Sequence, residues 1–574
     1  MFAFIFALPL IAALLCMALN HIVPTRWLGI GAAGALLLAV GALLAPSPTP
    51  LSVQTWAVPG EQPVSLVLAF DMTSRPFALL ALGGGALALL ALALALPRDL
   101  RGFGGLIAAL LLVSLAVVIG MANQEPVLLP FAWALAALLG FAALRASGTI
   151  GGAGALPVGL LAGLVSALLL VGATLAPDAT ASGPAALVCW TLVELLTLGA
   201  PPFHAVFDEP AEAPAALVGP LLALGLPLLG GYTLLHFAAT QWATAPLTWR
   251  MAWTLLGLLA VLACAAGAIG TTRVRRLIGW QLSAQFGLVL ISIGLGGDQP
   301  PLALAAGLLV NAAVTTLACY LAMIVLERRA GTDDLEIIGA HGPLLLPGLA
   351  FLLAAASAVG CLGTWGWWVQ SELFERARST APWLIAPLLA GDVLRALAYV
   401  APLAAFWRMA EARPLVGVSP RRGWPTLVAM LCPAVAVLPL LAWGVAPELA
   451  WEGWLAGFQR AGATPPLPGA LARFGSGLAA LALIGLPLLA TRGRTRRAPV
   501  DQDVRNTALL IPQALGYSLR GLIGLGAPDE LFRAIWAGLL NFSRAAARLL
   551  SLFEQRYYLA GLMIAVIIVI MLMI

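Results

Sequence analysis

Residues 190–232, which read WTLVELLTLGAPPFHAVFDEPAEAPAALVGPLLALGLPLLGGY, decide the fold of this chain. An apolar helical run stops at the Gly-Ala-Pro-Pro sequence of residues 199–202, passes His204, and becomes apolar again. Pro201 and Pro202 lack backbone N–H groups and therefore predict a broken helix. The flanking chain is so apolar that the break is expected at or near membrane depth. Irregular backbone is tolerated there only where protein or a water-filled cavity satisfies its polar groups, which indicates a candidate transport site.

A second interruption follows in residues 360–372, which read GCLGTWGWWVQSE. Gly363 and Gly366 predict a second broken helix, and the ionisable residue Glu372 comes after it. Two breaks at matching positions of two halves of a chain are typical of an inverted repeat. The residue pattern alone leaves open that each break is an ordinary loop.

Composition places the chain in a membrane. Of its 574 residues 61% are hydrophobic and 10% are charged, whereas soluble domains carry about 25% charged residues. All 30 basic residues are arginine, because the sequence contains no lysine. We interpret the net charge of +5 as a topology signal and expect no binding to nucleic acid. The six cysteines stand singly in apolar segments, so the sequence predicts no metal site and no cofactor.

Apolar runs long enough to cross about 30 Å of hydrocarbon predict an all-α polytopic membrane protein with about 16 transmembrane helices. The predicted segments are residues 1–19, 26–46, 75–97, 103–121, 126–145, 155–176, 184–200, 214–238, 250–270, 276–296, 301–326, 345–368, 382–410, 425–445, 474–491 and 557–574. Arginines gather in the loops after the odd-numbered segments, and the positive-inside rule assigns such loops to the cytoplasm. We therefore expect a bacterial inner-membrane protein with both termini in the periplasm, in contact with the lipid bilayer.

The chain divides into five parts on this pattern. Between the last two predicted helices, apolar residues and arginines recur at helical spacing, which predicts a lateral amphipathic segment along the cytoplasmic interface. The expected parts are N-terminal transmembrane helices (1–121), a core with the inverted repeats (122–411), C-terminal core helices (412–491), the lateral segment (492–556) and a terminal anchor (557–574).

Several motifs resemble one family in their content and order. They are PPFHAVFDEPAEAP at residues 201–214, TTRVRRLIGWQLSAQFGLVLISIGLG at 271–296 and RRAGTDDLEIIGAHGPLLLPGLAF at 328–351. The chain resembles the antiporter-like membrane subunits, which include large membrane subunits of respiratory complex I, the Mrp antiporters and the membrane-bound group 4 hydrogenases. The resemblance implies two inverted five-helix repeats, each with one broken helix and a proton half-channel. It also implies a non-catalytic subunit that assembles with other membrane subunits.

The chain departs from this family at the positions where the resemblance implies titratable residues. A proton path through hydrocarbon needs closely spaced titratable groups or waters, because a buried charge is otherwise costly. The positions that match the family's lysines, glutamates and histidine hold Ala134, Thr197, Leu228, Asn311, Thr315 and Gln370. The sequence therefore predicts a degenerate proton relay.

Some ionisable residues remain near the two breaks. Glu194 is the most informative, since a carboxylate in a transmembrane helix indicates function by default, although a structural hydrogen bond to the break is an equal alternative. Asp392 and Arg395 share one helix face and predict a self-neutralised pair, and Gln281 and Gln285 predict contacts between helices. The candidate ion pathway comprises Glu194, Thr197, His204, His236, Gln370 and Glu372.

Three hypotheses follow from the sequence. The first is a subunit of a respiratory or hydrogenase-like assembly that keeps the antiporter fold, has lost the relay, and acts as a scaffold or coupling subunit. The second is an active proton or cation transporter that uses substitutes such as Glu194, His236 and Glu372. The third is a membrane partner of an inorganic-carbon uptake complex.

Overall fold

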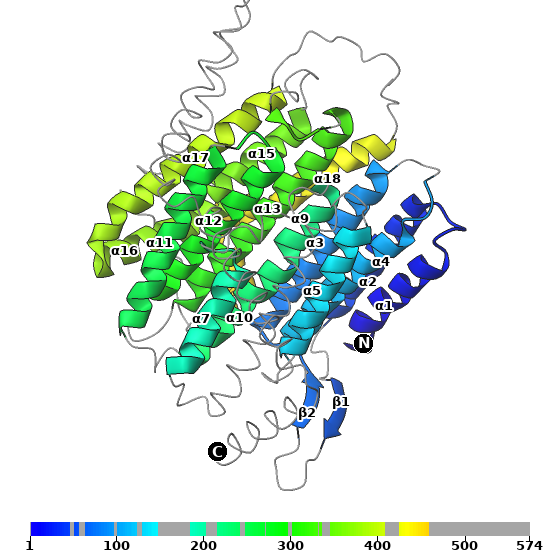
Figure 1. Ribbon diagram of the computed structural model, residues 1–574, viewed down its shortest axis with the longest axis horizontal. Coiled ribbons are helices and arrows are strands. Elements are labelled where there is room, and N and C mark those ends of the chain that lie inside the picture. The colour runs from blue at the N-terminus through cyan, green and yellow to red at the C-terminus, as the bar shows by residue number, and fades with distance from the viewer. Residues whose placement is uncertain are drawn as a thin grey trace, which may run out of the picture. The chain divides into compact units, whose positions relative to one another are not determined.

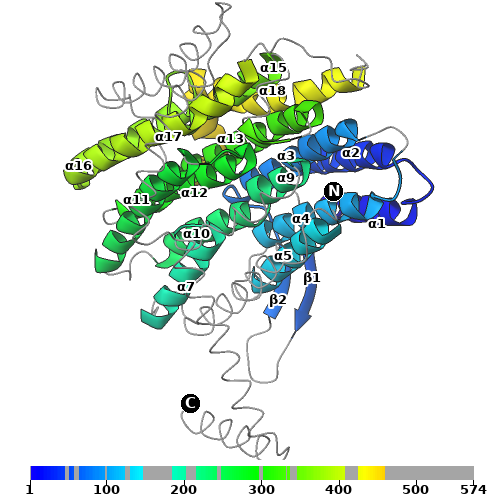
Figure 2. The same ribbon diagram turned by 45° about the horizontal axis from the view of Figure 1, so that its top comes forward.

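The structure, a computed structural model, describes residues 2–45, 51–56, 64–96, 100–122, 129–146, 184–201, 215–241, 247–269, 271–296, 301–330, 332–335, 345–407 and 424–458. The helices of the N-terminal half are α1 (Phe2–Ala18), α2 (Thr25–Leu44), α3 (Ser74–Ala95), α4 (Gly104–Ala122), α5 (Leu129–Ala146), α7 (Pro184–Thr197), α9 (Ala215–Leu224), α10 (Leu226–Gln241) and α11 (Leu247–Ile269). The later helices are α12 (Val274–Gly294), α13 (Leu302–Ala330), α15 (Leu345–Ala358), α16 (Trp365–Thr380), η4 (Pro382–Leu384), α17 (Ile385–Trp407), α18 (Trp424–Val445), η5 (Leu449–Trp454) and η6 (Ala456–Phe458). Figures 1 and 2 show these helices side by side in two views.

The described part of the chain is mostly helical and crosses the membrane repeatedly. Nine helical stretches in it are long and apolar enough to span a bilayer. Hydrocarbon offers no partner for backbone N–H and C=O groups, so a helix, which pairs them internally, is the form such segments take. The chain is therefore a multi-pass membrane protein, and the total of about sixteen helices stays a prediction.

Helix α13 is the centre of the described bundle. It packs against α3, α9, α12, α15, α16 and α18 (Figure 1), and its apolar window is buried throughout. A helix that is apolar on all sides is expected in such a position. The outer helices α2 and α18 bury less than half of their apolar windows, so their outward faces suit lipid or a neighbouring membrane protein.

Helices α11 and α12 approach each other very closely. A side chain at Gly257 would place its Cβ 2.5 Å from the carbonyl oxygen of Gly287, so the contact requires glycine. Small residues of this kind allow two transmembrane helices to pack backbone against backbone. This contact fixes α12, which carries the Gln281 and Gln285 side chains.

A β-hairpin, which the sequence did not predict, interrupts the mostly helical chain. Strands β1 (Leu51–Trp56) and β2 (Val64–Leu68) pair antiparallel, with Leu51 opposite Leu68, and Figure 1 labels them below the helices. Val, Thr and Trp favour strands, and these runs are too short to cross a membrane as helices. The hairpin connects α2 to the start of α3.

The helical predictions agree with the structure over the residues it describes. Every predicted segment other than 155–176, 474–491 and 557–574 coincides with one or more helices, and those three, together with the lateral segment 492–556, lie outside the described residues. Segment 214–238 consists of two helices, α9 and α10, which meet at Gly225. Helix α16 continues to Thr380, well beyond the predicted end at residue 368.

Candidate functional site

The first break is a helix end capped by glycine. Helix α7 ends at Thr197, and Gly199 has a φ of +58°. The N–H of Ala200 donates to the carbonyl of Leu195 over 3.0 Å, a six-to-one bond of the Schellman type that satisfies a free carbonyl at the helix end. Pro201 follows and is buried, whereas Pro202 and His204 lie outside the described residues.

The second break lies between α15 and α16. Residues 359–364 are non-helical, and Gly360 and Gly363 have φ values of +73° and +82°, which favour glycine. Gly366 was expected in the break but lies in the first turn of α16, so the break begins and ends earlier than predicted. Gly366 allows the start of α16 to approach Ser357 closely, because a Cβ at residue 366 would overlap the carbonyl oxygen of Ser357.

The free carbonyl of Ala358, at the end of α15, receives two side-chain donors. Gln370 Nε2 donates to it over 2.8 Å, and the guanidinium of Arg395 donates to it from α17. The last carbonyls of a helix have no intrahelical partner, and a buried one without any partner is costly. Gln370, a candidate ion-pathway residue, thus acts here as a cap for the interrupted helix.

Ser357, the neighbour of Ala358, connects the break to α13. Asn311 Nδ2 donates to the Ser357 carbonyl over 3.2 Å, and Ser357 Oγ donates to Asn311 Oδ1 over 2.7 Å. The Thr315 hydroxyl lies 2.7 Å from the Asn311 carbonyl and 3.1 Å from Gln285 Oε1 on α12. Asn311 and Thr315, two of the positions without titratable groups, are therefore joined by neutral hydrogen bonds.

The network ends in one buried ion pair. Arg395 Nη1 and Asp392 Oδ1 lie 3.1 Å apart, and the Arg395 side chain is fully buried. Gln281 Nε2 donates to the backbone carbonyl of Arg395 over 3.3 Å. The predicted self-neutralised pair and the predicted helix contacts of Gln281 and Gln285 are both confirmed.

We call this set of hydrogen-bonded side chains the α15-end network. It consists of Gln281, Gln285, Asn311, Thr315, Ser357, Gln370, Asp392 and Arg395. Amides and hydroxyls do not change charge near neutral pH, and only the ion pair carries charge. The network can hold helices together, but its members offer a proton no chain of titratable groups.

The first half contains a buried carboxyl of a different kind. Glu194 is 1% exposed, and neither of its oxygens has a hydrogen-bond partner among the described residues. Thr197 donates its hydroxyl to the backbone carbonyl of Glu194 over 3.2 Å instead of to the carboxyl. The structural hydrogen bond considered for Glu194 is thus absent from the described part of the chain.

The remaining candidate residues are not hydrogen-bonded to the Glu194 carboxyl. Glu372 pairs with Arg376 one turn along α16, with Oε1 and Nε 2.6 Å apart. His236 lies near the end of α10 with an exposed side chain. Ala134 on α5 and Leu228 on α10, which match family positions with titratable residues, are apolar, and Leu228 is fully buried.

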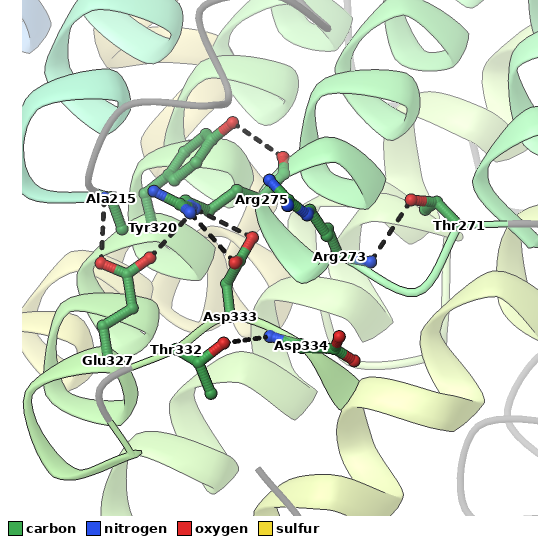
Figure 3. A network of polar contacts seen from close by, with 9 residues as sticks. All are labelled: Ala215, Thr271, Arg273, Arg275, Tyr320, Glu327, Thr332, Asp333 and Asp334. Carbon is green, nitrogen blue, oxygen red and sulfur yellow. Dashed lines mark hydrogen bonds and ion pairs between the residues drawn. The ribbon is translucent and has the colours of Figure 1, made fainter. Parts of the chain in front are cut away.

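A cluster of charged residues that the sequence did not predict joins three helices at one end of the bundle (Figure 3). Arg275, at the start of α12, makes a two-pronged ion pair with Asp333, with N···O distances of 2.9 and 3.0 Å. Glu327 of α13 lies 3.2 Å from Arg275 Nε and accepts the N–H of Ala215, the first residue of α9, over 3.1 Å. One sequence signal could have indicated this cluster. Arg275, in the motif that begins at residue 271, and Asp333, in the motif that begins at residue 328, carry opposite charges.

No cluster in the described residues suits a metal ion, since no group of three histidine, cysteine or carboxylate side chains gathers there.

Comparisons with known proteins agree with the fold. The family model described as NADH:quinone oxidoreductase/Mrp antiporter, transmembrane, matches residues 188–394. NADH-quinone oxidoreductase subunit N of Dehalococcoides mccartyi is 25% identical over 219 residues, 36% of this chain and 43% of that protein. NAD(P)H-quinone oxidoreductase subunit 2 of a Synechococcus species is 28% identical over 139 residues, 24% of this chain and 26% of that protein. The matches thus span less than half the length of these relatives.

Solved structures share the fold over a larger part of the chain. The Mrp complex from a Dietzia species has a TM-score of 0.68 at 20% identity, covering 95% of this chain and 62% of that one. Respiratory complex I from Thermus thermophilus has a TM-score of 0.60 at 22% identity, covering 78% and 99%. An archaeal membrane-bound sulfane sulfur reductase has a TM-score of 0.65 at 17% identity, covering 84% and 99%.

Proposed function

We infer that this chain belongs to the family of antiporter-like membrane subunits found in complex I-like and Mrp-like assemblies, and we propose that it is a scaffold or coupling subunit. It assembles with other membrane subunits of a respiratory or hydrogenase-like complex. It does not itself carry protons across the second half of the fold. The inverted repeats, each with one break, belong to this proposal.

The observation that carries the proposal is the α15-end network. Asn311, Thr315 and Gln370 stand where the family resemblance implies titratable groups, and all three are bound to each other or to backbone through neutral hydrogen bonds. Buried hydrogen bonds of this kind hold the side chains that they join in fixed positions. Asn311, Thr315 and Gln370 therefore stabilise the packing of the second break and do not provide groups for proton transfer.

The ion pair supports the same interpretation. A charge in the interior of a membrane protein is usually tied to an ion or proton path. Arg395 instead divides its donors between Asp392 and the Ala358 carbonyl, which are both local structural partners. Through the bond from Arg395 to the Ala358 carbonyl, the pair links α17 to the end of α15.

The second candidate function is translocation through the first half, and Glu194 is the observation that favours it. A buried carboxyl without a partner can bind and release a proton. Continuous transport would need more than this group, because Thr197, one turn along α7, and Leu228 on α10 cannot titrate. We therefore rank transport below the scaffold role.

Purification tests the proposal directly. A tag on this chain should recover several membrane subunits together with a redox module, and deletion of the chain should lower the amount of the assembled complex. The chain reconstituted alone in liposomes should not dissipate a pH gradient on addition of sodium or potassium ions. Cation–proton exchange by the isolated chain would contradict the scaffold role.

The proposed location is the bacterial inner membrane, with both termini in the periplasm. In a variant without native cysteines, a cysteine at residue 2 should react with an impermeant thiol reagent from outside. Arg494→Cys should be protected from the same reagent. Efficient labelling of residue 494 from outside would contradict the sixteen-helix arrangement.

A further inference from the structure

Glu194 differs from the other deeply buried carboxyl groups in the described residues. Asp392 pairs with Arg395, and Asp333 pairs with Arg275, both within 3.1 Å. Glu194 is equally buried, but neither carboxyl oxygen has a hydrogen-bond partner there. Its charge state must therefore be explained without a partner cation.

Aromatic side chains pack against the turn of α7 that precedes Glu194. Trp190, one turn earlier on α7, stacks on Phe237 of α10 with ring centroids 5.1 Å apart. On another side the indole of Trp253 donates to Thr191 over 3.1 Å, which brings α11 against α7. These contacts cover the helix turn that precedes Glu194.

The local backbone adds no positive charge. Glu194 lies in the last turn of α7, where the carbonyl end of the helix dipole is negative and disfavours an anion. The ionisable side chains on α10 and α11 are Tyr232, His236, Arg250 and Cys264. None of them forms a hydrogen bond with the Glu194 oxygens.

We propose that Glu194 is an occluded proton-binding site, whose carboxyl holds a proton and is open to covalent modification by a lipid-soluble carbodiimide. An isolated carboxylate in an apolar environment is costly, and binding one proton removes the charge. The site holds the proton in place; no described titratable neighbour receives it. The inference does not depend on the scaffold role, because it concerns occupancy at equilibrium.

The chemistry of the modification is balanced. The carboxyl proton moves to one carbodiimide nitrogen while a carboxyl oxygen bonds to the central carbon, giving an O-acylisourea. Without water, the acyl group then moves from oxygen to nitrogen and leaves a stable N-acylurea. No leaving group and no redox partner are required.

Infrared difference spectroscopy tests the protonation state without depending on access of a reagent. The spectrum of wild-type protein minus Glu194→Gln, recorded on the assembled complex in native lipid, should contain the carbonyl stretching band of a protonated carboxyl. The band should persist from mildly acidic to mildly alkaline pH. Carboxylate stretching bands in its place would overturn the proposal.

Labelling with dicyclohexylcarbodiimide tests the reactive site. Peptide mass spectrometry should find the adduct on Glu194 in wild-type membranes and lose it in Glu194→Gln. Glu372 is the control, since it lies on α16 and pairs with Arg376 over 2.6 Å, and it should remain unmodified. Equal labelling of Glu372, or suppression of the Glu194 adduct by sodium ions, would contradict a protonated site.

Discussion

The side-chain amide of Gln370 donates a 2.8 Å hydrogen bond to the carbonyl oxygen of Ala358, the last residue of α15. The bond joins the two helices on either side of the second break. It also places a neutral donor where the family resemblance implies a titratable side chain. A residue at a proposed ion-path position is thereby used as a helix cap.

Replacing Gln370 should destabilise the packing of α15 and α16 at the second break. Gln370→Leu removes one of the two donors to Ala358, and we expect the free energy of unfolding to fall by about 1–2 kcal/mol, since Arg395 remains as a donor. Denaturant titration in detergent micelles measures this loss. Gln370→Glu should cost more, because a carboxylate also lacks a donor and in addition places a buried negative charge beside the carbonyl oxygen. Equal stability of wild type and Gln370→Leu would show that the bond does not stabilise the break.

The Asp392–Arg395 pair predicts non-additive mutations. Arg395→Leu leaves the Asp392 carboxylate buried and unpaired, so we expect a loss of about 3–5 kcal/mol in the free energy of unfolding. The double variant Asp392→Leu/Arg395→Leu removes both charges and should lose less than Arg395→Leu alone. A double-mutant cycle measures the coupling energy. Additive losses would contradict a direct pairing.

The charged cluster of Figure 3 predicts a structural role for Arg275. Arg275→Gln leaves Asp333 and Glu327 without their cation and should lower the free energy of unfolding by about 1–3 kcal/mol. Arg378→Gln is the control, because Arg378 forms an exposed pair with Glu375 that should contribute less than about 1 kcal/mol. Similar losses in the two variants would indicate that the cluster adds no stability beyond a surface ion pair.

Asp71 predicts a dependence of stability on acid pH. Burial by itself raises the pKa of this carboxyl, but hydrogen bonds from Ser74 and Thr73 outweigh burial and lower the pKa below its usual value. Because the folded-state pKa is lowered, the contribution to stability is complete above the unfolded pKa of about 3.9 and is lost as pH falls through the folded-state pKa. Asp71→Asn cannot ionise.

Melting temperatures of wild type and Asp71→Asn should therefore differ near neutral pH and converge in acid. The difference reflects a carboxylate that caps the start of α3, a contact usually worth about 1 kcal/mol. A gap that stays constant down to strongly acid pH would mean that ionisation of Asp71 does not contribute.

Much of the helical fold could be predicted from the sequence, because apolar length and proline or glycine breaks are local signals. Helices α3, α4 and α12 begin and end within a few residues of the predicted bounds. The β-hairpin was missed because its strands are short and lie between strong helical signals. The position of Gly366 depends on how closely α16 approaches Ser357, which no local pattern encodes.

The candidate site was predicted in its residue types but not in its connections. The absence of lysine and the Asp392–Arg395 spacing are visible in the sequence, whereas the donation of Gln370 and Arg395 to one carbonyl arises from three helices meeting. Arg275 and Asp333 have opposite charges, yet 58 positions separate them and many other arginines were available. Tertiary packing chooses among such partners.

Proton translocation by the fully assembled complex carrying Glu194→Gln distinguishes a scaffold subunit from a transporter. Glutamine keeps the shape of a protonated glutamate but cannot release a proton. The complex should be reconstituted in liposomes, with electron transfer and subunit content measured alongside the proton-to-electron ratio. We expect the wild-type ratio, because Glu194 holds its proton and the α15-end network offers no titratable path among the described residues. A lower ratio at normal electron transfer and intact subunit content would contradict the account and make this chain an active transporter.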